Sequence, residues 1–234
     1  NKIFSESSGE WNLIISSDTE FPKYSINNMI MGLEKCSKQQ KILCPVTNSS
    51  GNAQHIYFDT DEKKIILDRI PNLTKQGSGE LMEIYRADFF CVAIRTDLWD
   101  LLKGISEDFG MGYYEDFDFC LRAKSKGYNP YLYEKWFVYH QGSASFGANK
   151  KDLSLLLKKN KRVLKHKHKI IEFRHRRNDI LLFLIKHSRK LINNNLLTKL
   201  RIEYLQHDLP RSPLKKIIWK IKIKLLIHYH LKIV

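Results

Sequence analysis

The chain has 234 residues, of which 43% are hydrophobic, 12% aromatic and 28% charged, and its formal net charge is +15. This length and apolar content suffice for a hydrophobic core in one or two domains, so a wholly disordered chain is excluded. The charge is divided unevenly. Residues 1–149 hold 16 Lys and Arg against 20 Asp and Glu, net −4, whereas residues 150–234 hold 24 against 5, net +19.

Apolar runs of strand length predict strands at residues 11–16, 41–46, 89–94, 131–133 and 136–140. Apolar residues at helical spacing predict helices at residues 25–33, 96–102 and 115–126. The first strand is expected to be buried and to deliver polar residues to its carboxyl end. The strand, helix, strand order at the start is typical of the α/β class.

Two segments are predicted to lack helix. Residues 54–68 contain two short apolar runs separated by a polar turn, which indicates a hairpin or excursion, and residues 73–80 have the composition of a mobile loop. From about residue 150 the pattern becomes helical and basic, with a break at residues 208–213.

No apolar run has the ~20 residues that cross a bilayer, since the longest, residues 180–185, ends at Lys186. A signal pattern is lacking, and the four cysteines have neither the density of a disulfide scaffold nor a Cys-X-X-Cys pair. We therefore expect reduced thiols and a cytoplasmic protein.

Residues 110–128 place three carboxylates between a glycine-rich turn and a predicted helix. Acidic residues favour the first turn of a helix because they complement its dipole, so a structural role is one interpretation. Asp118 has the i,i+4 spacing to pair with Arg122 along the helix. Glu115 and Asp116 lie nearer the turn, where a carboxylate that faces a cleft can act as a general base.

Four segments in order resemble family 2 glycosyltransferases, similar to those of bacterial cell-surface polysaccharides. They are IISSDTEFPKYSINNMI at 14–30 followed by CPVTNSSG at 44–51, FFCVAIR at 89–95, GMGYYEDFDFCLRAKSKGY at 110–128 and VYHQGSASFG at 138–147. The resemblance implies an α/β fold of the GT-A type: a partial mixed sheet flanked by helices in residues 1–149, followed by a basic helical extension in residues 150–234. Because only eleven residues precede the apolar run at 12–16, we expect the nucleotide-binding half to be missing.

The resemblance also implies site residues. Asp18 stands at the last position of the family's acidic motif, which here reads Ser16-Ser17-Asp18, and would hold Mg²⁺ or Mn²⁺ on the donor diphosphate. His140 matches the histidine that faces the metal and the diphosphate, and imidazole is a suitable Mn²⁺ ligand. Asp116 corresponds to the catalytic base of inverting members, with Glu115 beside it. By position alone, Asp18 and His140 are also typical of structural residues at strand ends.

The implied function is an inverting transfer of a sugar from a nucleotide-diphosphate donor to a saccharide or lipid-linked acceptor, in surface-polysaccharide biosynthesis. The alternative is a non-catalytic relative that binds a glycan or a partner. The sequence names neither the donor sugar and base nor the acceptor and linkage. Nor does it decide between an excised half and a degenerate protein, although the intact motifs favour the former.

The basic tail has three interpretations. A charge run is most often a solvated face. Cations interleaved with Trp219 and neighbouring Ile and Leu also suit peripheral contact with an anionic membrane at its inner face. Nucleic-acid binding is the third, and the acidic remainder of the chain and the lack of a recognition motif argue against it.

Overall fold

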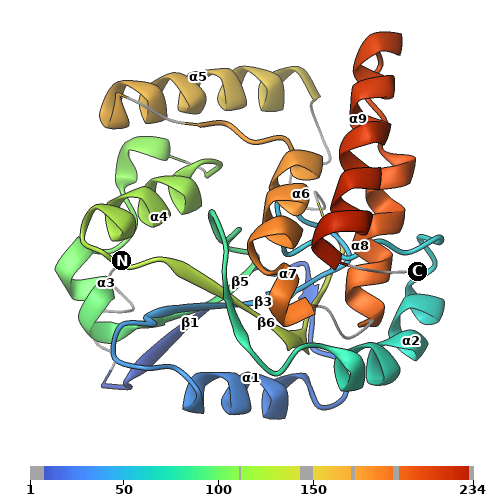
Figure 1. Cartoon of the computed structure of the whole chain (residues 1–234). Coiled ribbons are helices and arrows are strands. Elements are labelled where there is room, and N and C mark those ends of the chain that lie inside the picture. Colours follow the sequence, from blue (N-terminus) through green and yellow to red (C-terminus); the bar gives the residue numbers. More distant parts are fainter. Residues whose placement is uncertain (1–7, 111, 143–149, 170–171, 192–194, 232–234) are drawn as a thin grey trace.

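The structure is a computed structural model that describes residues 8–110, 112–142, 150–169, 172–191 and 195–231. Residues 143–147, part of the fourth segment of the resemblance, lie outside the described residues. The fold is α/β, with a mixed sheet flanked by helices and a basic helical segment after it (Figure 1). This confirms the predicted fold class.

A five-stranded sheet in the order β1-β5-β3-β6-β4 forms the centre of the molecule. Its strands are β1 (Trp11–Ile15), β3 (Ile42–Val46), β4 (Leu81–Glu83), β5 (Cys91–Arg95) and β6 (Pro130–Phe137). Only β3 and β6 run parallel among these neighbours, and the other pairs are antiparallel. Two short strands, β2 (Thr19–Glu20) and β7 (Tyr139–His140), form a second sheet.

The alternation of side chains along the strands divides the core between the two faces of the sheet. On β5, Val92 and Ile94 belong to the larger core cluster, whereas Cys91 and Ala93 belong to a cluster on the other face. The second cluster packs against α1 (Ser25–Glu34) through Met29 and Leu33. The larger cluster includes residues of the remaining helices except α5 (Lys150–His168), whose Leu164 packs in a third cluster with Phe109 and Phe117.

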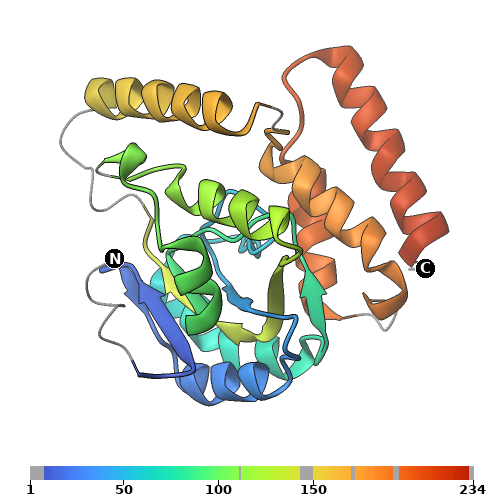
Figure 2. The same cartoon turned by 90° about the vertical axis from the view of Figure 1, so that its left-hand side faces the viewer.

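Those helices are α2 (Lys63–Gln76), α3 (Thr96–Leu102), α4 (Glu115–Ser125), α5 (Lys150–His168), α6 (Arg176–Lys186), α7 (Ser188–Leu191), α8 (Leu196–His207) and α9 (Pro213–Leu225). A 3₁₀ turn, Glu107–Phe109, precedes α4, and a π-helical turn, Leu226–Leu231, follows α9. In Figures 1 and 2, α5 lies over α4, and α9 lies on the outside of the molecule. No helix among the described residues is long and apolar enough to cross a membrane. All four cysteines are free.

Two sequence predictions were wrong. The segment expected to form a hairpin and then a mobile loop instead contains α2, because Ile66, Ile70 and Leu73 recur at helical spacing and are buried in the core. The strand expected to be buried, β1, lies at the edge of the sheet, where Ile15 is 49% exposed.

Helices α6 to α9 share the core of the sheet. Ile180, Leu197 and Leu205 belong to the same buried cluster as Ile42 and Val92. The division of the chain at residue 149 into two domains stays a prediction.

A buried ion pair fastens α8 to β6. Arg201 pairs with Glu134, and both side chains are fully buried. The second oxygen of Glu134 accepts hydrogen bonds from the Ser78 amide at 2.9 Å and from the Asn195 side chain at 2.8 Å. The Glu134 carboxylate thus accepts hydrogen bonds from three donors. A fully buried charge needs such partners because it has lost its hydration.

Candidate active site

The short sheet of β2 and β7 brings Asp18 to His140. Its register pairs Thr19 with His140, and the Gln141 amide donates a hydrogen bond of 2.9 Å to the Asp18 carbonyl. As a result, His140 Nε2 lies 3.3 Å from Asp18 Oδ2. The Ser16 hydroxyl donates to the other Asp18 carboxylate oxygen at 2.5 Å. Two residues 122 positions apart in the chain therefore form one polar pair.

The surroundings of the imidazole ring fix which nitrogen faces Asp18. His140 Nδ1 lies 2.8 Å from the Ser49 carbonyl oxygen, which can only accept, so Nδ1 carries a proton and donates it. The ring stacks on Phe90, with centroids 4.9 Å apart and planes 12° apart. In the neutral ring, Nε2 then presents a lone pair to a carboxylate oxygen. Two acceptors face each other, and a cation or a second proton between them removes the repulsion.

The pair fits a divalent cation as an incomplete ligand set of one imidazole nitrogen and one carboxylate oxygen. No group of three or more His, Cys, Asp or Glu side chains with metal-binding geometry occurs among the described residues. A cation held here would need further oxygen ligands from a bound molecule or water. Phosphate oxygens are such ligands for Mg²⁺ and Mn²⁺.

The turn before α4 has an unusual backbone. Gly112, Tyr113 and Tyr114 have φ values of 118°, 67° and 76°, so two tyrosines adopt the left-handed conformation that side chains disfavour. Asn160, on α5 and 1% exposed, donates its side-chain amide to the carbonyls of Phe109, Gly112 and Tyr113 at 2.8, 2.7 and 3.2 Å. These bonds hold the turn in a conformation that the chain would otherwise avoid.

The turn delivers Glu115 and Asp116 to the cavity at the start of α4. Burial raises the pKa of the Asp116 carboxyl to about 7, and the nearby charges of Asp88 and Glu115 add to the rise. Arg86 and the Phe117 amide, which donates to Asp116 at 2.6 Å, act in the opposite direction. Burial and Asp88 also raise the pKa of Glu115, and Glu115 Oε2 has no hydrogen-bond partner among the described residues.

Asp118, in the same first turn of α4, does not face the cavity. It is fully buried and pairs with Arg122 Nε at 2.7 Å, with His168 Nε2 at 2.8 Å and with Lys167 Nζ at 3.2 Å. The predicted Asp118–Arg122 pair is confirmed. The two residues from α5 show that Asp118 also joins α4 to the helix above it.

Sequence reasoning missed three charged residues of the cavity. Asp88 accepts hydrogen bonds from the Gly51 amide at 2.8 Å and the Ser50 hydroxyl at 3.0 Å, and its other oxygen lies 3.4 Å from Arg86. Arg176, at the start of α6, also lines the cavity. The Arg86-Ala87-Asp88 triplet directly before the apolar run at 89–94 was a usable signal. Arg176 had none, because it lies within a run of basic residues.

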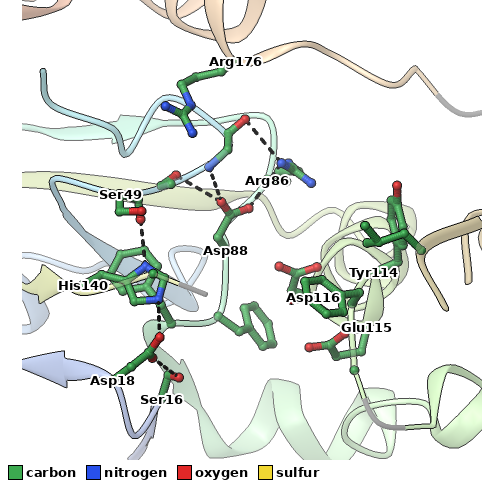
Figure 3. Close-up of a pocket in the computed structure, with 18 residues that line it drawn as sticks. Ser16, Asp18, Ser49, Arg86, Asp88, Tyr114, Glu115, Asp116, His140 and Arg176 are labelled. Atoms are coloured by element: carbon green, nitrogen blue, oxygen red, sulfur yellow. Dashed lines mark hydrogen bonds and ion pairs between the residues drawn. The ribbon is translucent and has the colours of Figure 1, made fainter. Parts of the chain in front are cut away.

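All these groups line one cavity of about 520 Å³. Figure 3 shows Asp18 and His140 on one side, Glu115 and Asp116 on the opposite side, Asp88 between them, and Arg86 and Arg176 above. The four residues predicted from the sequence therefore meet, although they come from three separate parts of the chain. Tyr113 and Tyr114 also line the cavity.

Comparison with known proteins finds structural similarity and no sequence similarity. No protein family model matches the chain, and no curated protein matches its sequence. The chain is similar in structure to a mannosyltransferase, PcManGT from Pyrobaculum calidifontis, solved in complex with GDP-Man and Mn²⁺. The identity is 12% and the TM-score 0.38, over 98% of this chain and 48% of that one. The chain thus spans about half the length of the mannosyltransferase.

Proposed function

We propose that the cavity is the active site of an inverting glycosyltransferase that takes its sugar from a nucleotide-diphosphate donor. One observation carries this proposal. A carboxylate–imidazole pair suited to a divalent cation faces, across a single cavity, a carboxyl group whose pKa is raised to about 7. The motifs that resemble family 2 glycosyltransferases contribute these same residues, and this supports the proposal from the sequence side.

Asp18 and His140 would hold Mg²⁺ or Mn²⁺ against the donor diphosphate. When bound, the cation supplies positive charge next to the departing diphosphate. This charge stabilises the negative charge that develops in the transition state by several kcal/mol. Arg176 has no ion-pair partner among the described residues and lines the same cavity. Its guanidinium is therefore available to bind phosphate oxygens directly.

Asp116 would take the proton from the acceptor hydroxyl as that oxygen attacks the anomeric carbon. The carbon–oxygen bond to the diphosphate breaks as the new glycosidic bond forms, and attack from the side opposite the leaving group inverts the configuration. A base with a pKa near 7 is suited to this step, because it is ionised near neutral pH and still basic enough to accept a proton. Glu115, adjacent to it, is the second candidate for this role.

The metal is tested by titration calorimetry of inorganic diphosphate in the presence and absence of Mn²⁺. We expect Mn²⁺-dependent binding that Asp18→Ala and His140→Ala each abolish, since each removes one of two protein ligands. Asp68→Ala and His166→Ala, which alter exposed residues of the same types, serve as matched controls. Diphosphate binding that a chelator leaves unchanged would overturn the metal assignment.

The base is tested by release of nucleoside diphosphate from UDP-, GDP- and dTDP-sugars in the presence of saccharide acceptors. Asp116→Asn should lower turnover by about 10²–10⁴-fold with diphosphate binding retained, because the amide keeps the shape but accepts no proton. If Glu115→Gln has this effect and Asp116→Asn does not, the two roles are exchanged. Binding without turnover for every donor would favour the alternative, a non-catalytic binding module.

The saccharide or lipid-linked acceptor, the role in surface-polysaccharide biosynthesis and the cytoplasmic location remain part of this proposal. The expectation that nucleic acid is not a partner also stays a prediction.

A further inference from the structure

Helix α9 packs through only one of its faces. Trp219 and Ile223 are each 4% exposed, and the Trp219 indole donates a hydrogen bond of 2.9 Å to the Leu205 carbonyl at the end of α8. The Arg177 guanidinium lies over the same indole ring, 5.9 Å from its centroid. Trp219, which the sequence suggested as a membrane contact, is therefore a core residue.

The opposite face of α9 carries a row of exposed apolar side chains, which we call the apolar stripe. Its members are Leu214 (67% exposed), Ile217 (58%), Ile218 (46%), Ile221 (52%) and Leu225 (47%). Their spacing of three, one, three and four residues places them on one side of a helix with 3.6 residues per turn. These exposed fractions mean that no described element covers the stripe, and Figures 1 and 2 show α9 on the outside of the molecule.

Lysines border the apolar stripe on both sides. At about 100° per residue, Lys215 and Lys222 fall along one edge, and Lys220 and Lys224 along the other. Lys216 lies further toward the packed face. No acidic residue follows Asp208 in the sequence, so this surface carries only positive charge.

We infer that the apolar stripe and its lysines form a surface that lies on an anionic membrane, with α9 parallel to the bilayer plane. In this orientation the Ile and Leu side chains enter the boundary of the acyl chains. The long lysine stems let the ammonium groups reach the acidic headgroups on either side. The inference is independent of the proposed function, because no residue of the cavity takes part in it.

Charge and shape favour lipid over the two other occupants. Two copies of the stripe placed face to face would bring rows of lysines together, and α9 offers no carboxylate to pair with them. Nucleic acid would use the lysines but would leave five apolar side chains without a partner. A lipid surface accommodates both features.

Vesicle co-sedimentation of the 234-residue chain tests the inference, with phosphatidylcholine vesicles containing phosphatidylglycerol and pure phosphatidylcholine vesicles as the neutral reference. We expect binding to the anionic vesicles only. Replacing Lys215, Lys220, Lys222 and Lys224 by Gln should weaken it at least about a hundredfold, since each basic residue near such a surface contributes roughly fivefold. Replacing Lys35, Lys38, Lys64 and Lys126, exposed lysines on other elements, removes the same charge and should leave most of the binding.

The apolar stripe is tested separately by the double variant Ile217→Asn, Ile221→Asn. It leaves Trp219 and Ile223 in place, so the fold is retained, and it should weaken vesicle binding by more than about tenfold. The matched control is Leu101→Asn with Leu155→Asn, which alters two side chains of similar exposure elsewhere. Equal loss in both double variants would overturn the inference. So would absence of vesicle binding combined with a dimer that Ile217→Asn, Ile221→Asn dissociates, or with duplex DNA binding in place of lipid binding.

Discussion

Residues 8–142 and residues 150–231 differ sharply in charge, yet the candidate active site needs both. The first region supplies Asp18, His140 and Asp116, the residues to which we assign the proposed chemistry. The second supplies groups that hold or complement them, namely Asn160 on the turn before α4 and Arg176 in the cavity wall. The change of charge near residue 150 therefore marks a boundary neither in the hydrophobic core nor in the lining of the cavity.

The largest expected effect comes from breaking the buried pair between the two regions. Arg201→Met leaves the Glu134 carboxylate buried without its charge partner, and removing one partner of such a pair typically costs about 3–5 kcal/mol. Urea unfolding should show that loss. Adding Glu134→Gln to Arg201→Met should recover part of it, because the uncompensated charge is gone.

The control for this prediction lies two residues away on the same helix. Lys199 is exposed, and Lys199→Met should change the free energy of unfolding by less than about 0.5 kcal/mol. A similarly small effect of Arg201→Met would show that the helical region contributes little to the stability of the sheet.

The second prediction concerns the hold of α5 on the turn before α4. Asn160→Leu fills a similar volume but removes the donor for three carbonyls, so we expect a loss of roughly 2 kcal/mol in unfolding free energy. Turnover should fall more than the affinity for diphosphate, because the turn positions Asp116 and not Asp18. Asn178→Leu, at an exposed position of α6, is the control. If the Asn160→Leu protein is destabilised but its turnover is unchanged, Asn160 stabilises the fold and does not position Asp116 for catalysis.

The third prediction concerns pH. Asp116 must be ionised to accept a proton, and its pKa is raised to about 7. Turnover should therefore rise about tenfold per pH unit below pH 7 and level off above it. Arg86→Gln removes a charge that lowers this pKa and should move the midpoint of the profile to higher pH. A midpoint that stays in place would contradict the assignment of Asp116 as the base.

The same shift has a consequence for stability. Between the usual Asp pKa of 3.8 and about 7, the folded protein binds a proton at Asp116 that the unfolded chain has released. The contribution of the Asp116 carboxyl to the free energy of unfolding is therefore fully present below its unfolded pKa of 3.8. It is lost as the pH rises through the folded pKa of about 7. Asp116→Asn should be more stable than the native protein above pH 7, and the difference should vanish near pH 4.

Sequence patterns predicted what depends on local spacing. The helix at residues 96–102 and the Asp118–Arg122 pair needed only neighbouring residues, and both are confirmed. The segment of α2 was misread because KKIILD fits both a short strand and a helix turn, and only packing of Ile66 and Ile70 on the core decides between them.

The candidate site was predictable only in part. Motif order identified Asp18, Glu115, Asp116 and His140, and the structure brings them into one cavity, although their catalytic and metal-binding roles stay predictions. The residues next to Asn160 and Arg201 in the sequence do not indicate that these two side chains are buried and hydrogen-bonded. Their partners lie about 50 and 67 positions away in the chain, and a polar residue in a basic helical run looks like a solvated one. Tertiary packing alone makes these two residues buried.

The smallest expected effect comes from an exposed ion pair that also joins the two regions. Lys190 on α7 lies 3.4 Å from Glu80, with side chains 46% and 63% exposed. Water screens such a pair and the side chains lose entropy in forming it, so Lys190→Met should change the unfolding free energy by less than about 0.5 kcal/mol. Set beside Arg201→Met, it compares two ion pairs of the same charge that differ in burial. A loss from Lys190→Met as large as that from Arg201→Met would mean that attraction across the surface, and not burial, holds the basic helices on the sheet.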